Sequence, residues 1–168
     1  MGVLGIFSSS VPYHLYGYSL LFGSTIYQSF FVGITAFKAL PRNQFSALQR
    51  KIFPPYFAMQ TVLPVFLALT APFPIKNDGF SIVVLAVSAI TSLINLVVIG
   101  PRTVKIMGRR HAQEVKEDKK YYDEGVSQDM KKLNKEFGTI HGASTILNLA
   151  GLFTTAAYGA VLASKLAN

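Results

Sequence analysis

The stretch FGTIHGASTILNLAGL, Phe137–Leu152, decides how this chain folds. It is mostly apolar, and from Gly138 to Ser164 the only titratable side chains are His141 and a tyrosine. A helix needs about 20 mainly apolar residues to cross ~30 Å of hydrocarbon. The stretch therefore predicts a membrane-spanning helix, and its four polar side chains need an explanation.

Three other stretches have the same apolar character. Residues 15–37, 52–75 and 79–101 contain no Asp, Glu, Lys or Arg. A soluble four-helix bundle would present a charged face on every helix, and these stretches present none. We therefore predict an all-α, integral membrane four-helix bundle that forms a single transmembrane domain over residues 1–168. The spans are expected at about residues 13–39, 55–74, 80–100 and 138–164.

The charge distribution predicts how the spans are oriented. Of 16 Lys and Arg residues, 14 lie in the connections after the first and third spans, and only Lys76 and Lys165 lie at the other side. Basic connections face the cytosol in most membrane proteins. Both termini are therefore expected on the non-cytosolic side, of an endomembrane, plasma or mitochondrial membrane. The net charge of +8 then suits anionic lipid headgroups on the cytosolic face.

The two cytosolic connections differ in length. Residues 43–53 carry apolar side chains at near-helical spacing and predict a short interfacial helix. Residues 101–137 are rich in helix formers and predict a cytosolic helical hairpin between the third and fourth spans, broken at Gly125 and Ser127. This hairpin is either a docking site for a partner or a solvated charged surface.

The polar side chains of Phe137–Leu152 follow a helical spacing of i, i+3, i+4 and i+7, so they share one face. The first and third spans show a similar face. Such groups either pack helices together through hydrogen bonds or line a polar cavity for a ligand. The candidate residues for packing or for a cavity are His14, Gln28, Ser88, Asn95, His141, Ser144 and Asn148.

Several chemistries are unlikely on sequence grounds. The chain has no cysteine, and no Asp or Glu lies within a span, which removes the usual nucleophiles and general bases. His14 and His141 begin opposite ends of the bundle and are not expected to share a metal ion. We therefore predict no enzyme activity, no metal and no cofactor. The basic connections lack the aromatic stacking surfaces of single-strand binders, so no nucleic-acid partner is expected.

The two proline–arginine pairs at the ends of the first and third spans are Pro41-Arg42 and Pro101-Arg102. Their arginines are candidates to bind lipid phosphates or helix ends at the cytosolic rim. The pairs also suggest a faint internal repeat of two related hairpins.

Several short motifs together resemble the transmembrane protein 205-like family of small four-span eukaryotic membrane proteins. They are His14, Leu40-Pro41-Arg42, Phe53-Pro54, Pro101-Arg102, His141-Gly142 with Ser144, and Asn148-Leu149. The resemblance covers most of the chain, and the hairpin is the part least alike. It implies the same architecture and a link to secretory trafficking, without a defined activity.

These observations lead to two functional expectations. The first is a non-enzymatic multi-pass membrane protein that acts as an accessory or scaffold subunit, or in trafficking, with a membrane-protein partner or a second copy of itself. The alternative is a binder or carrier of a small lipid or porphyrin-like ligand in a polar intramembrane cavity.

Overall fold

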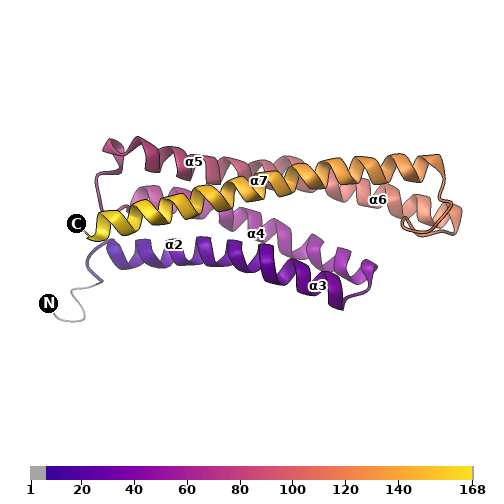
Figure 1. Ribbon diagram of the computed structural model, residues 1–168, viewed down its shortest axis with the longest axis horizontal. Coiled ribbons are helices and arrows are strands. Elements are labelled where there is room, and N and C mark those ends of the chain that lie inside the picture. The colour runs from indigo at the N-terminus through magenta and orange to yellow at the C-terminus, as the bar shows by residue number, and fades with distance from the viewer. Residues whose placement is uncertain (1–6, 168) are drawn as a thin grey trace.

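The computed structural model describes residues 7–167, which form four long rods of helix in antiparallel order (Figure 1). Each rod is long and apolar enough to cross a membrane. The all-α, four-span fold predicted from the sequence is therefore confirmed. In chain order, the helices are α2 (Val11–Ile26), the π-helix η1 (Tyr27–Val32), α3 (Gly33–Ala39), α4 (Arg42–Thr70), α5 (Gly79–Ile94), the π-helix η3 (Asn95–Ile99), α6 (Gly100–Glu117) and α7 (Gln128–Ala167).

The first connection is a tight corner at Leu40 and Pro41. Leu40 is extended, with φ −109° and ψ 144°, as expected for a residue before proline. Two contacts to the Phe37 ring stabilise this corner. The Arg42 guanidinium lies 3.9 Å from the ring centre, and the Phe45 ring packs edge-on against it. Helix α4 therefore runs antiparallel to the first rod.

Helix α4 differs from the prediction. Residues 43–53 do not form a separate interfacial helix, because α4 runs without a break from Arg42 to Thr70 and contains Pro54, Pro55 and Pro64. A proline removes one backbone hydrogen bond, and membrane helices accept this where neighbouring groups satisfy the freed carbonyl. The span also ends at Thr70 rather than residue 74, since Pro72 and Pro74 follow directly.

The connection between α4 and α5 is a short turn that ends at Asn77-Asp78-Gly79. A single turn of 3₁₀ helix, η2 (Ile75–Asn77), leads into Asp78, whose carboxylate accepts a hydrogen bond of 3.1 Å from the Ser81 backbone N–H. That bond caps the N-terminus of α5. The same carboxylate lies 3.7 Å from Nζ of Lys165 in α7, so it also joins the turn to the end of the fourth rod.

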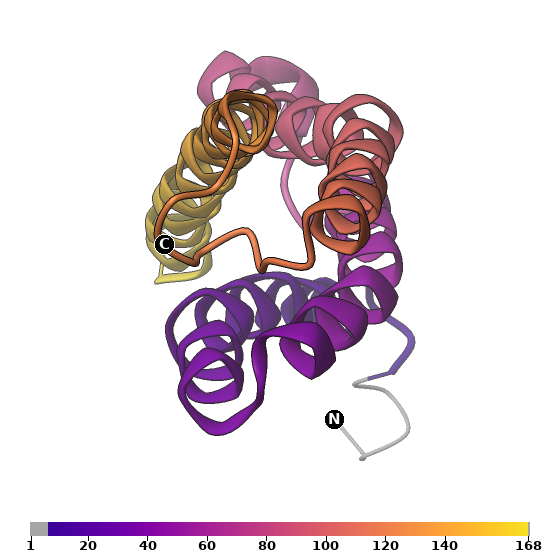
Figure 2. The ribbon, with the colours of Figure 1, turned by 90° about the vertical axis from the view of Figure 1, so that its right-hand side faces the viewer.

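The best-packed part of the core lies in the half of the bundle nearest the C-terminus. A buried cluster there takes side chains from all four rods: Leu21, Leu67, Val84, Leu85, Tyr158 and Leu162. In the other half, η1 and α3 contribute no buried residue. Viewed from the hairpin end, α6 and α7 lie on one side of the bundle and α3 and α4 on the other (Figure 2).

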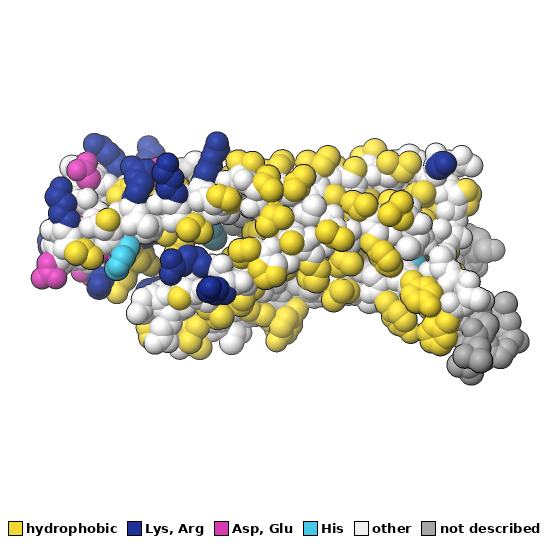
Figure 3. Space-filling view, turned by 180° about the vertical axis from the view of Figure 1, so that it is seen from behind, with side chains coloured by type: hydrophobic (Ala, Val, Ile, Leu, Met, Phe, Trp, Pro, Cys, Tyr) yellow, Lys and Arg dark blue, Asp and Glu magenta, His cyan; other side chains and the backbone are white. Residues whose placement is uncertain are grey.

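Helices α6 and α7 extend past the end of α3 and α4 as a hairpin (Figure 1). The third rod continues beyond its apolar span, as predicted. It ends earlier than expected, however, because Asp118 adopts the left-handed conformation with φ 51° and terminates α6. Gly125, with φ 70°, then turns the chain toward α7. The surface agrees with this division: apolar side chains cover the middle of the molecule, and basic side chains gather over the hairpin (Figure 3).

Candidate functional site

The polar side chains within the spans form four groups along the bundle. The first, at the end near the termini, is built around His14 of α2. Its Nε2 lies 2.8 Å from the Tyr158 hydroxyl of α7, and its Nδ1 lies 3.0 Å from the Thr70 hydroxyl of α4. His14 and Tyr158 are both fully buried. Three rods are thus joined through one imidazole.

The hydrogen bonds around His14 define its tautomer. The Thr70 hydroxyl donates its single hydrogen to the Phe66 carbonyl at 2.8 Å. Its oxygen therefore accepts a hydrogen bond from the Nδ1–H group of His14. Nε2 is then the acceptor, and the Tyr158 hydroxyl is its donor. Both ring nitrogens thus have a hydrogen-bond partner, and the imidazole links α2 to α4 and α7.

The second group joins the first and second rods. Gln60 of α4 donates to the Ser24 hydroxyl at 2.9 Å and accepts from Thr25 at 2.8 Å. Gln60 is 4% exposed. Helical spacing did not point to Gln60, because α4 carries no repeating polar face. The available signal was a lone glutamine inside a charge-free span, since uncompensated polar groups in hydrocarbon are costly.

The third group joins the third and fourth rods. The hydroxyls of Ser88 in α5 and Thr155 in α7 lie 3.1 Å apart and are buried. One turn away, a β-carbon on Gly151 would lie 3.3 Å from the Thr91 hydroxyl oxygen, so α5 and α7 approach closely there. Ser88 therefore lies at the contact between α5 and α7.

The fourth group lies nearer the hairpin, and not all of its polar atoms have a hydrogen-bond partner. Nδ2 of Asn95 is 3.4 Å from the Asn148 side-chain oxygen and 3.4 Å from the Ser144 carbonyl. Oδ1 of Asn95 and Nε2 of Gln28 are buried and have no hydrogen-bond partner among the described residues. Asn95 and Gln28 both lie in π-helices, which occur often at functional sites.

His141 is not part of any interhelical group. Its side chain is exposed, and its ring stacks on Phe137 of the same helix at 5.7 Å. His141 was a candidate for helix packing or for a cavity, and its exposed ring takes part in no interhelical hydrogen bond among the described residues. Thr145, which is also exposed, donates its hydroxyl to the His141 carbonyl of the same helix.

The two histidines are far apart, as expected. Tyr158, which contacts His14, lies about 25 Å along α7 from His141 at 1.5 Å per residue. Within residues 7–167, no group of three or more His, Asp or Glu side chains is placed to hold a metal ion.

The two candidate arginines occupy different settings. Arg42 stacks on Phe37 at the first corner. Arg102 is exposed and lines a groove between α6 and α7. Only Arg102 therefore has a concave surface beside it.

The fold and the interhelical hydrogen bonds define a four-span, multi-pass membrane protein. The model of the family described as "Domain of unknown function (DUF4149)" matches residues 16–112, and the chain belongs to this family. A relative named "Xanthocillin biosynthesis cluster protein D", from Aspergillus fumigatus, is 32% identical over 166 residues, which cover 99% of this chain and 97% of that protein. No solved structure gives a significant match.

Proposed function

We propose that this protein is a non-enzymatic accessory or scaffold subunit that recruits a partner through its cytosolic hairpin. Two exposed apolar side chains carry the proposal. Val115 of α6 is 72% exposed, and Tyr122 in the loop after it is 59% exposed. Both lie on the charged hairpin, outside the apolar belt. Aromatic and aliphatic side chains of this kind are the usual anchors of protein–protein interfaces.

Side-chain contacts hold the hairpin loop beside Tyr122 in place. The Arg110 guanidinium lies between the rings of Tyr121 and Phe137, at 3.8 and 4.5 Å from their centres. The side chain of Asn134 donates to the Tyr121 carbonyl at 2.8 Å. The loop is therefore tied to both α6 and α7, and the neighbouring Tyr122 stays at the surface.

Several polar groups within the spans support the accessory role, since they bond across helices and hold the rods together. The relative's name connects it with a biosynthesis cluster, so a membrane-bound role beside small-molecule enzymes is one setting for such a subunit. The likeness to transmembrane protein 205-like proteins favours secretory trafficking as another. In both settings the hairpin faces the cytosol.

Photo-cross-linking in native membranes tests the partner. A photoreactive phenylalanine analogue at Val115 should give a discrete protein adduct. The same analogue at Lys131, which is exposed on α7, should not. An adduct with the mass of two chains would identify the partner as a second copy. No adduct at Val115, or equal adducts at both positions, would overturn the proposal.

The second candidate function is a small-ligand binder, and the unpartnered atoms of Asn95 and Gln28 favour it. A lipid hydroxyl or a protonated porphyrin carboxyl would donate to Oδ1 of Asn95, and an oxygen of either ligand would accept from Nε2 of Gln28. A porphyrin would give a visible absorption band in protein purified from its own membrane, and Asn95→Leu should abolish it. Protein without such a band and without any bound small molecule would exclude this function.

A further inference from the structure

A groove of about 820 Å³ runs between α6 and the first half of α7. Its walls change character along its length. The end within the membrane is apolar, formed by Ile99, Ile140 and Ala143, and Ile106 follows on the hairpin side. The remaining lining side chains are mostly basic: Arg102, Lys105, Arg109, Lys132 and Lys135.

The groove crosses the membrane boundary. Ile99 belongs to the charge-free third span, and Arg102 is the first charged residue after it. From Ile99 to Arg109, α6 rises about 15 Å at 1.5 Å per residue. The apolar end therefore lies at the depth of acyl chains, and the basic end lies at the depth of headgroups.

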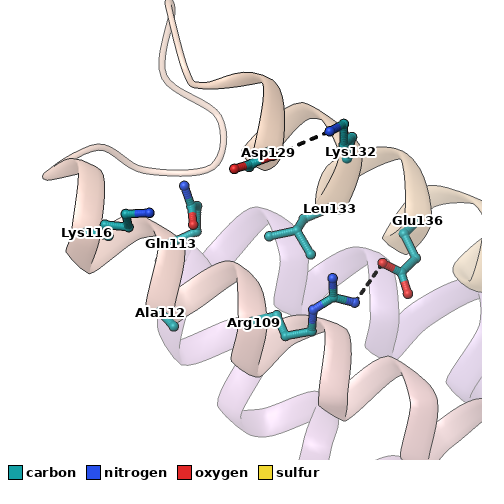
Figure 4. Close-up of a pocket in the computed structure, with 8 residues that line it drawn as sticks. All are labelled: Arg109, Ala112, Gln113, Lys116, Asp129, Lys132, Leu133 and Glu136. Atoms are coloured by element: carbon teal, nitrogen blue, oxygen red, sulfur yellow. Dashed lines mark hydrogen bonds and ion pairs between the residues drawn. The ribbon is translucent and has the colours of Figure 1, made fainter.

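Much of the basic charge has no internal partner. Arg109 is paired with Glu136 at 3.0 Å, and Lys132 lies 3.5 Å from Asp129. Figure 4 shows both pairs in a second pocket, which shares Arg109, Lys132 and Glu136 with the groove. Among residues 7–167, no carboxylate forms an ion pair with Arg102, Lys105 or Lys135. Three cations thus surround one concave surface without compensation.

We propose that this groove binds one phospholipid whose headgroup carries at least two negative charges, such as cardiolipin or a phosphorylated phosphatidylinositol. Arg and Lys side chains recognise phosphate oxygens through charge-assisted hydrogen bonds. Basic pockets between transmembrane helices at the cytosolic side bind headgroups of this kind. The volume is within the ~300–1,000 Å³ usual for ligand sites.

A singly charged headgroup would leave two of the three free cations uncompensated. A soluble phosphate would leave the apolar end empty. The lipid satisfies both ends at once. This inference rests on the placement of the hairpin at the cytosolic surface, and it is independent of whether Val115 and Tyr122 contact a protein.

Native mass spectrometry of the full-length protein tests the groove. The protein is taken from phosphatidylcholine nanodiscs that contain a minor fraction of cardiolipin, phosphatidylinositol bisphosphate or phosphatidylserine. One retained molecule of a doubly or more highly charged lipid per chain is the expected result. If phosphatidylserine or phosphatidylcholine were retained as well as the lipids with two or more headgroup charges, the proposal that the groove selects a multiply charged headgroup would be overturned.

Matched variants separate a built site from general attraction. The triple variant Arg102→Gln, Lys105→Gln, Lys135→Gln should lose retention about tenfold or more. The control Lys38→Gln, Arg50→Gln, Lys51→Gln removes the same charge from the other connection and should lose less than about twofold, because it leaves the groove intact. Equal losses would mean a diffuse surface attraction and would overturn the groove, whereas the cross-linking at Val115 would be unaffected.

The apolar end has its own control. Ala143→Phe should fill it and reduce lipid retention, whereas Ala156→Phe, an exposed position further along α7, should not. Tight binding of soluble inositol trisphosphate by the wild type, with no effect of Ala143→Phe on lipid retention, would assign the groove to a free phosphate compound and overturn the proposal.

Discussion

At the scale of single residues, the bundle is held by hydroxyls and amides that bond across helices. Ser88 and Thr155 join α5 to α7, His14 joins three rods, and Gln60 joins α4 to α2. Interhelical hydrogen bonds in membranes contribute about 0.6 kcal/mol on average, up to ~1.7. The contribution of each bond is small, so several are needed to align the rods.

The double variant Ser88→Ala, Thr155→Val tests this contribution. It should lower the free energy of unfolding in detergent by about 0.6–2 kcal/mol, because it removes a buried interhelical bond. Thr145→Val is the matched control, since Thr145 is exposed and donates only within α7. A control loss as large as that of the double variant would show that the interhelical bond contributes nothing.

Close helix contacts make a second prediction. A β-carbon on Gly159 would overlap the Tyr18 ring, whereas one on Gly142 would meet nothing within 4 Å. Gly159→Leu should therefore separate α7 from α2 and destabilise the protein by about 1–3 kcal/mol, as overpacking does. Gly142→Leu should be close to neutral. Thermal unfolding of the two variants side by side measures the difference, and equal melting temperatures would contradict the close approach.

At the scale of elements, the hairpin depends on Glu117, the last residue of α6. Its carboxylate accepts hydrogen bonds from the Ser127 hydroxyl, the Gln113 side chain and, at 3.1 Å, the Ser127 backbone N–H. These bonds, those from Ser127 and Gln113 first, hold the pKa of Glu117 below its usual range. The carboxylate thereby closes the loop against α7.

A lowered folded-state pKa gives a definite pH dependence. The stabilisation is fully present above the unfolded-state pKa of a glutamate, and it is lost as the pH falls through the lower folded-state pKa. The protection of the Ser127 amide, its exchange rate relative to the intrinsic rate at the same pH, should therefore fall in acid. Because Glu114 and Asp123 also accept hydrogen bonds in this loop, the comparison is with Glu117→Gln. That variant should show a flatter pH profile after correction for intrinsic exchange, and an unchanged profile would refute the role of Glu117.

Secondary structure was predictable where charge-free runs and turn chemistry agreed. The four rods follow from the charge-free runs, whereas the cap at Asp78 was seen only in the structure. The continuity of α4 through Pro54 and Pro55 did not follow, because it depends on neighbours that satisfy the freed backbone groups. The end of α6 was missed because Asp118, well before Gly125, adopts the left-handed conformation that terminates the helix, and a non-glycine residue gives little sign of this in the sequence.

The candidate site was predicted in part, for a reason that belongs to the whole molecule. The faces with Ser88 and Asn95 were found because their spacing is helical and their neighbours are apolar. His141 has the same spacing, yet the rods separate toward the hairpin and leave it exposed. Spacing reports which residues share a face; it does not report which part of a helix has a neighbour.

At the scale of the whole molecule, the start of α2 and the end of α7 lie at one end of the bundle and the basic hairpin lies at the other (Figure 1). Fourteen basic residues lie in the two connections at the hairpin end, against two at the opposite end. This asymmetry predicts that the hairpin faces the cytosol. The docking surface and the lipid groove both depend on that placement.

Glycosylation mapping tests the placement most directly. An Asn-X-Ser acceptor is added through a short flexible linker after Asn168 in one variant, and inserted between Asp123 and Glu124 in the hairpin loop in another. Expressed in a eukaryotic secretory pathway, the C-terminal acceptor should be modified and the hairpin acceptor should not. Modification of the hairpin with an unmodified C-terminus would invert the orientation and contradict the account.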